Sequence, residues 1–157
     1  DTLFANQHKA LDEMPDELRQ RVEGLVAVHS AEAVYAPDGY FSLDGDQESD
    51  RSMKIVLTEG ARDKQRHPLV REHSETGRPA LYSTVGYIEA LEGLTKEESD
   101  ALLIELYHYQ GQEQFIYRHK WQPNMLVMWD NRCLLHMATG GYEGQERRLH
   151  RTTFVEG

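Results

Sequence analysis

The chain has one cysteine, no long apolar run and too few basic residues to balance its acidic ones. A single cysteine, Cys133, cannot form an internal disulfide, which fits a reducing cytoplasmic compartment. No apolar run approaches the roughly 18 residues of a membrane span, and the N-terminus lacks a signal-peptide pattern. With 17 Lys and Arg against 27 Asp and Glu, the formal net charge is −10. We therefore expect neither a membrane nor a nucleic acid as a partner.

The composition that remains is typical of one globular domain. The 157 residues are 39% apolar and 28% charged, enough to bury a sizeable core. The chain starts at Asp1 rather than Met, and the stretch from Thr2 to Ala5 already has the pattern of a strand. We therefore expect residues 1–157 to be a single domain that is the C-terminal portion of a longer polypeptide.

Apolar spacing predicts two main helices. The first covers residues 7–24, with Pro15 in an early turn. The second starts at a capping box made by Thr95 and Glu98 and runs to about Gln110. Both should pack on a sheet through their apolar stripes.

Strand patterns account for much of the remaining chain. A short buried strand is predicted at residues 25–28, and residues 67–82 have strand character around a turn at 74–77. Two more strands are predicted at residues 115–121 and 125–129. Because residues 125–129 are apolar on both faces, we expect that strand in the middle of a β-sandwich.

Residues 31–66 lack clear periodicity and are acidic. Their Asp-x-Asp run invites a calcium interpretation, but an EF-hand needs Gly and Glu where this chain has Ser49 and Ile55. A long polar segment in a compact domain is typical of a lid or a disordered loop. We predict a lid or mobile loop here, which would suit an enzyme that closes over its substrate.

Chemistry-bearing residues gather near the end of the chain. His136 follows an apolar strand, and Arg147 and Arg151 stand four positions apart in a strand-like segment. Strand alternation would place both arginines on one face and Arg148 and His150 on the other. Guanidinium forks bind oxyanions in bidentate fashion, so the pattern indicates a metal beside an anion site. Taken alone, the same residues also fit two surface arginines and a core histidine.

Several segments resemble one enzyme family, in the same order along the chain. Residues 124–136 read NMLVMWDNRCLLH, and residues 147–153 read RRLHRTT. Residues 1–5 read DTLFA, residues 67–70 read HPLV, and residues 76–82 read TGRPALY. Together they resemble the iron(II)/2-oxoglutarate dioxygenases related to taurine dioxygenase and the phenoxyalkanoate dioxygenases.

The resemblance implies a mainly β fold with flanking α-helices, the double-stranded β-helix or jelly roll of the clavaminate synthase-like type, without its N-terminal part. It implies that His136 is the second histidine of a two-histidine, one-carboxylate Fe(II) site. The first histidine and the carboxylate would lie outside this sequence. Thr2 and Arg147 would hold 2-oxoglutarate, and Arg151 would hold the anionic head of the substrate. Thr2 could equally be an ordinary strand threonine.

The implied activity is hydroxylation of an aliphatic C–H bond in a small anionic molecule such as a sulfonate or carboxylate. The reaction would consume O2 and 2-oxoglutarate and release succinate and CO2. Self-association is left open, with the helix at residues 95–110 as a candidate contact. The primary substrate cannot be read from the sequence.

Other metal patterns fit less well. His73-Ser74-Glu75 has the His-x-Glu spacing of a facial triad, but it falls on a predicted surface turn, and the family's motif would lie before Asp1. Cys133 and His136 have Cys-x-x-His spacing, yet two ligands do not define a zinc site. The remaining histidines are predicted to be structural or exposed: His8, His29, His67, His108 and His119.

The alternative function is a non-catalytic jelly-roll module that binds small anions through Arg147 and Arg151, or an inactive fragment without the His-x-Asp ligands. A His-x-Asp motif roughly 25 residues before Asp1 would favour the enzyme, and its absence the binding module. If the 157 residues were the whole protein, we would expect no turnover, because one histidine cannot hold Fe(II) in a facial site.

Overall fold

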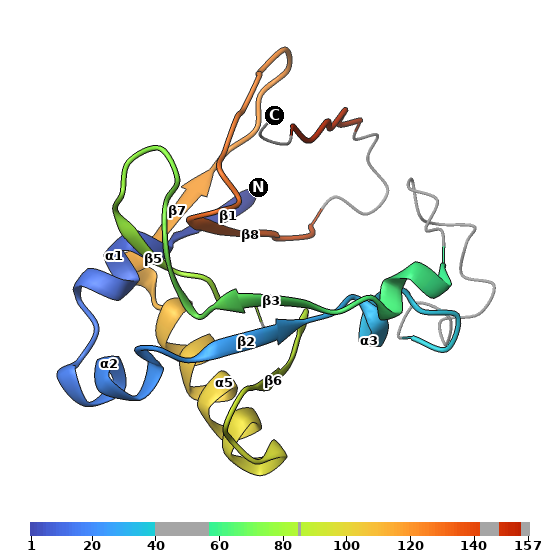
Figure 1. Cartoon of the computed structure of the whole chain (residues 1–157). Coiled ribbons are helices and arrows are strands. Elements are labelled where there is room, and N and C mark those ends of the chain that lie inside the picture. The colour runs from blue at the N-terminus through green and yellow to red at the C-terminus, as the bar shows by residue number, and fades with distance from the viewer. Residues whose placement is uncertain (40–56, 85, 142–147, 155–157) are drawn as a thin grey trace.

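Two antiparallel three-stranded sheets form the centre of the molecule (Figure 1). The structure is a computed structural model of the chain, and it describes residues 1–39, 57–84, 86–141 and 148–154. The first sheet has the order β7-β1-β8, and the second has the order β3-β2-β6. A separate hairpin pairs β4 with β5. The strands are β1 Thr2–Asn6, β2 Val26–His29, β3 Gln65–Pro68, β4 Val70–Glu72, β5 Pro79–Leu81, β6 Ile88–Leu91, β7 Ile116–His119 and β8 Leu134–Ala138.

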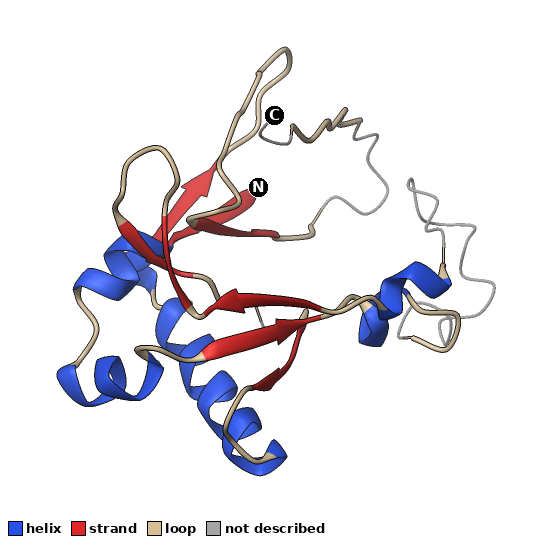
Figure 2. Cartoon of the chain, viewed as in Figure 1, coloured by secondary structure: helices blue, strands red, loops and turns tan. Residues whose placement is uncertain are grey.

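The helices gather mainly on one side of the sheets, away from the long loop between β7 and β8 (Figure 2). They are α1 Gln7–Asp12, α2 Asp16–Val22, α3 Glu32–Tyr35 and α5 Lys96–Gln110, with 3-10 turns η2 Glu59–Arg62 and η3 Glu113–Phe115. The predicted helix at residues 7–24 is therefore two helices. Pro15 separates them because it has no N–H and its ring would clash with the preceding turn.

The long helix α5 starts where the sequence predicts. The Thr95 side chain accepts a hydrogen bond from the Glu98 N–H, and the Glu98 carboxylate accepts one from the Thr95 N–H. Its buried leucines, Leu102, Leu103 and Leu106, belong to the main apolar core. This core also takes side chains from α1, α2, β2, β6 and the β4–β5 hairpin, and so joins the helical side to the second sheet.

Two predicted strands are absent from the described part of the chain. Residues 125–129 are not paired, and Leu126 and Met128 are 85% and 79% exposed, so the prediction of a central buried strand is wrong here. Residues 148–154 are also unpaired and exposed. Strand apolarity alone does not make a sheet, because a strand also needs a neighbour that supplies ladder hydrogen bonds.

The predicted hairpin at residues 67–82 and the short strand near residue 26 are confirmed. The predicted lid is described only at its two ends, where α3 and η2 lie, and residues 40–56 fall outside the described residues. Within the described residues, no helix combines the length and the apolar character that crossing a membrane requires.

Candidate active site

Strand β1 brings the candidate site residues to one face of the first sheet. Thr2 pairs with Ala138, and Phe4 pairs with His136, in the antiparallel register of β1 and β8. Directly opposed residues of an antiparallel pair share a face, and so do residues two apart on one strand. Thr2 and His136 therefore point to the same side of the sheet, two positions out of register.

Two aromatic rings lie beside His136, which is otherwise exposed. The ring of Trp129 lies 5.2 Å from that of His136 and 5.4 Å from that of Phe4, measured between centroids. Although part of His136 reaches solvent, these rings cover its other side, and this burial lowers the pKa of the imidazole. A neutral imidazole keeps the nitrogen lone pair that a metal ion requires. His136 therefore fits the role of one metal ligand.

Thr2 is nearly buried, with 8% of its surface exposed. The Nε1–H of Trp121 donates a hydrogen bond to its Oγ1 at 2.9 Å. His119 pairs with Thr2 across β1 and β7, and its ring packs edge-on against Trp121 with centroids 4.8 Å apart. The Nε2 atom of His119 is buried and has no partner among the described residues. Thr2, His119 and Trp121 thus form a contiguous polar cluster at the end of β7.

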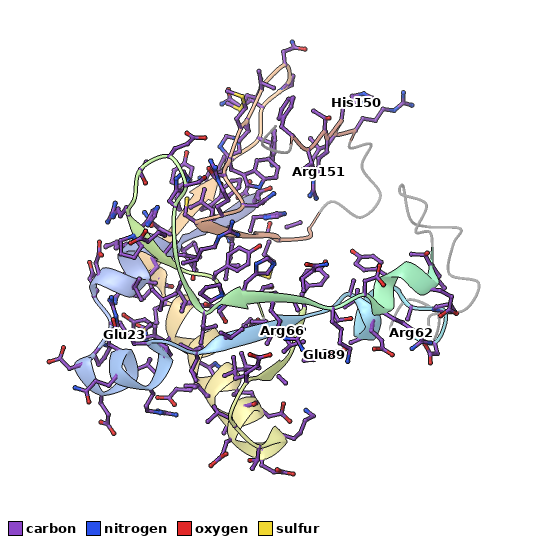
Figure 3. All side chains as sticks on the ribbon, viewed as in Figure 1. Glu23, Arg62, Arg66, Glu89, His150 and Arg151 are labelled. Carbon is purple, nitrogen blue, oxygen red and sulfur yellow. The ribbon has the colours of Figure 1, made fainter. Side chains whose placement is uncertain are left out.

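Arg151, near the end of the described chain, acts electrostatically on His136. Its side chain points down from its segment in Figure 3, toward the side on which β8 lies, whereas His150 points the other way. After burial, the positive charge of Arg151 is the second cause of the lowered pKa of His136. Burial and the hydrogen bond with Tyr35 raise the pKa of Tyr87 to about 12, and the positive charge of Arg151 partly opposes this rise. Arg151 therefore lies within electrostatic reach of both His136 and Tyr87.

Arg147, the predicted 2-oxoglutarate ligand, lies outside the described residues, so its role remains a prediction. The strand that was to carry both arginines is not formed over residues 148–154. The opposite directions of His150 and Arg151 nevertheless match the alternation of an extended chain.

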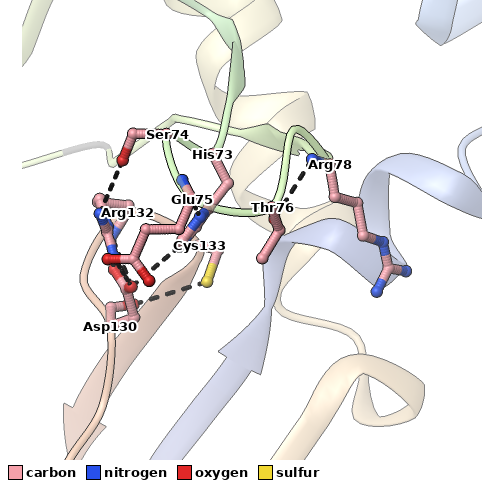
Figure 4. A network of polar contacts seen from close by, with 8 residues as sticks. All are labelled: His73, Ser74, Glu75, Thr76, Arg78, Asp130, Arg132 and Cys133. Carbon is pink, nitrogen blue, oxygen red and sulfur yellow. Dashed lines mark hydrogen bonds and ion pairs between the residues drawn. The ribbon is translucent and has the colours of Figure 1, made fainter.

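A second polar cluster lies at the other end of β8 (Figure 4). His73 Nε2 lies 3.0 Å from Asp130 Oδ2, and the Glu75 N–H donates to His73 Nδ1 at 3.3 Å. Nδ1 is thus the acceptor, so Nε2 carries the proton and donates to Asp130. Arg132 also donates to Asp130, with Nε 2.9 Å from Oδ1, and its guanidinium reaches Ser74 and Glu75. His73 is on the predicted turn, but the prediction that this turn leaves it at the surface is wrong, because it is only 8% exposed.

This cluster is the one group of three potential metal ligands among the described residues. The ligand atoms of His73, Asp130 and Cys133 lie within 4.8 Å of one another. Both ring nitrogens of His73 are already used, and Asp130 is neutralised by Arg132. Burial also raises the pKa of the Cys133 thiol, which keeps it protonated. The cluster is therefore a hydrogen-bonded clamp, and it does not include His136.

The other histidines match the structural expectation in most cases. His8 Nδ1 is 2.7 Å from the carbonyl oxygen of Pro79, and His29 and His67 pack edge to face against Tyr82 or each other. His108 is exposed on α5. Trp121 and the Asp130 clamp are not indicated by the sequence patterns. Trp121 stands two positions after His119 and so continues its face of β7, but its partner Thr2 is visible only from the strand register.

Comparison with known proteins places the chain in a family. Residues 1–153 match the model of the family described as "Taurine catabolism dioxygenase TauD, TfdA family". The chain is 35% identical over 156 residues to an alpha-ketoglutarate-dependent 2,4-dichlorophenoxyacetate dioxygenase of Cupriavidus pinatubonensis, covering 99% of this chain and 50% of that protein. The chain belongs to this family, as the sequence motifs predict.

Solved structures support the same assignment. A taurine dioxygenase from Burkholderia xenovorans superimposes with a TM-score of 0.64 at 30% identity, over 86% of this chain and 39% of that one. AAD-2 in complex with Mn(II) and N-oxalylglycine gives a TM-score of 0.67 at 29% identity, over 86% and 43%. The predicted jelly-roll fold is thereby confirmed, and the chain spans about half the length of the relatives it matches.

Proposed function

We infer that this chain is part of an Fe(II)- and 2-oxoglutarate-dependent dioxygenase that hydroxylates a small anionic molecule. The observation that carries this conclusion is the placement of Thr2 and His136 on one face of the first sheet, with the charge of Arg151 within electrostatic reach of His136. A hydroxyl donor, a neutral imidazole and a guanidinium are the groups that an oxo acid bound beside a metal needs.

Each residue has a distinct role in this proposal. His136 binds the metal through a ring nitrogen, while Phe4 and Trp129 hold the orientation of its ring. Thr2 donates to a carboxylate of 2-oxoglutarate, and Arg147 pairs with the carboxylate at the other end. Arg151 holds the anionic head of the primary substrate. When bound, the iron activates O2 and supplies the oxidising chemistry, and the residues of this chain bind and orient the reactants.

The substrate class follows from the charge of Arg151 and from the relatives. Their names include 2,4-dichlorophenoxyacetate, a carboxylate, and taurine, a sulfonate. Either head group matches a planar guanidinium fork. We propose an aliphatic C–H bond near such a head group as the site of hydroxylation.

A facial Fe(II) site needs a second histidine and a carboxylate in addition to His136. The described residues contain no ligand group of three that includes His136. We propose that residues 1–157 are the C-terminal portion of the catalytic domain and that a His-x-Asp motif in the same polypeptide completes the site. An anion-binding module remains the second candidate, because Arg147 and Arg151 could bind anions without a metal.

The test is formation of succinate from 2-oxoglutarate by the complete polypeptide that carries this chain. The assay supplies Fe(II) and O2 with a panel of small carboxylates and sulfonates, and a matched neutral amide accompanies each acid. The proposal predicts succinate that requires Fe(II) and rises with an acid but not with its amide. Anion binding without Fe(II)-dependent succinate under any condition would favour the binding module.

A further inference from the structure

The hydroxyl of Thr2 is held by a side chain that can only donate. Trp121 Nε1–H lies 2.9 Å from Thr2 Oγ1, and an indole has no acceptor. In this contact Thr2 is therefore the acceptor, and its own O–H hydrogen must point elsewhere. Within the described residues the Thr2 hydroxyl donates to no protein group.

We propose that Trp121 is a positioning residue that fixes the Thr2 hydroxyl as a hydrogen-bond donor toward the bound cosubstrate. This inference rests on the proposed function and deepens it, because it specifies the polarity of the cosubstrate contact. A hydroxyl that accepts from Trp121 presents its hydrogen to the site, and a carboxylate oxygen is the complementary acceptor.

The surroundings of Trp121 explain why the contact is fixed. Trp121 lies two residues beyond the end of β7, and the ring of His119 packs edge-on against it. Thr2 is nearly buried at the start of the central strand, opposite His119. Water therefore has little room to replace the indole as the partner of Oγ1, and burial strengthens the preference for a satisfied hydroxyl.

A purely structural role is the competing explanation, in which the bond only ties the chain after β7 to β1. The two explanations differ in what Trp121→Phe does. Phe keeps an aromatic ring but removes the N–H, so both predict some loss of stability. Only the positioning role predicts weaker 2-oxoglutarate binding that depends on the presence of the Thr2 hydroxyl.

The experiment is a double-mutant cycle on the complete enzyme. The dissociation constant of 2-oxoglutarate is measured by calorimetry, without O2 and with Mn(II) as the metal. The variants are Trp121→Phe, Thr2→Val and the double variant. Thr2→Ser serves as the conservative variant that restores a hydroxyl, and Tyr109→Phe removes a side-chain donor whose partner is the Ala10 carbonyl rather than Thr2.

We expect Trp121→Phe to raise the dissociation constant of 2-oxoglutarate about three- to tenfold, which corresponds to the loss of one neutral hydrogen bond. The same substitution should have less than about a twofold effect in the Thr2→Val background, because the coupled partner is gone. Thr2→Ser should keep the sensitivity to Trp121→Phe, and Tyr109→Phe should leave the affinity for 2-oxoglutarate within about twofold. If Trp121→Phe impairs folding, the isosteric 3-benzothienylalanine at position 121 removes the N–H and keeps the shape.

The outcomes separate this inference from the function on which it rests. Suppose that Thr2→Val weakens 2-oxoglutarate binding, but Trp121→Phe either has no effect or has the same effect with and without the Thr2 hydroxyl. The positioning role of Trp121 is then wrong, while the role of Thr2 stands. If Thr2→Val leaves the affinity unchanged, the assignment of Thr2 to the cosubstrate is wrong and the inference about Trp121 is wrong with it.

Discussion

His73 donates a hydrogen bond from Nε2 to Asp130 Oδ2 at 3.0 Å, linking the turn of the β4–β5 hairpin to the segment that leads into β8. Arg132 extends the link by donating to Asp130 and to Ser74 on the same turn (Figure 4). This clamp lies six residues before His136, and it holds the start of the strand that carries the proposed metal ligand. It therefore connects the packing of the hairpin to the geometry of the site.

The clamp predicts a specific pH dependence of stability. Hydrogen bonds from Arg132, followed by that from His73, hold the pKa of Asp130 well below its usual range. A carboxyl whose folded pKa is depressed stabilises the fold above its unfolded pKa of about 3.9, and this stability is lost as the pH falls toward the folded pKa. Asp130→Asn should therefore lower the free energy of unfolding at pH 7, by an amount that shrinks below about pH 4. Urea unfolding of both proteins between pH 7 and pH 3 measures this, and a difference that stays constant with pH would refute the ionic role.

The capping box predicts a smaller effect on stability. Thr95→Ala removes the acceptor of the Glu98 N–H at the first turn of α5 and should cost about 1 kcal/mol of unfolding free energy at neutral pH. Thr95→Ser keeps the cap oxygen and serves as the matched control. An unchanged denaturant midpoint for Thr95→Ala would show that the packing of the buried leucines alone fixes the start of the helix.

The arginines of the C-terminal segment should separate in steady-state kinetics. Arg147→Ala should raise the apparent KM for 2-oxoglutarate, because loss of a charge-assisted partner in a partly desolvated site costs about 2–5 kcal/mol, or roughly thirtyfold to several thousandfold. Arg151→Ala should instead raise the KM for the primary substrate. Arg148→Ala should change either KM little. If Arg148→Ala is the variant that raises the KM for 2-oxoglutarate, the assumed alternation of side chains is off by one residue.

The sequence predicted individual helices and turns better than it predicted which strands pair with one another. The cap at Thr95 and the turn after Glu72 depend on residues a few positions apart, and both are confirmed. The predicted strand at residues 125–129 failed because its apolar pattern shows what a strand would bury, not whether another strand lies beside it. The break at Pro15 shows that one local rule can override a longer periodic pattern.

The site was predictable in part for the same reason. His136 and Thr2 were identified through family motifs, and the pairing of β1 with β8 adds that they share a face. The bond from Trp121 to Thr2 joins residues 119 positions apart, so no sequence spacing could indicate it. The position of His73 in the motif order argues against a metal ligand there, and its bond to Asp130, 57 positions away, supplies the physical reason.

The most direct test of the account is metal binding by His136→Ala in the complete enzyme. Loss of a residue that only hydrogen-bonds to a metal ligand lowers metal affinity by about 10- to 100-fold. Loss of a ligand itself should therefore lower the affinity for Mn(II) by at least about a hundredfold. Fe(II)-dependent succinate formation should disappear, while the melting curve stays normal because His136 is partly exposed. His108→Ala, an exposed histidine on α5, is the matched control and should retain both properties. Near-normal Mn(II) affinity and turnover in a folded His136→Ala variant would contradict the assignment of the metal site.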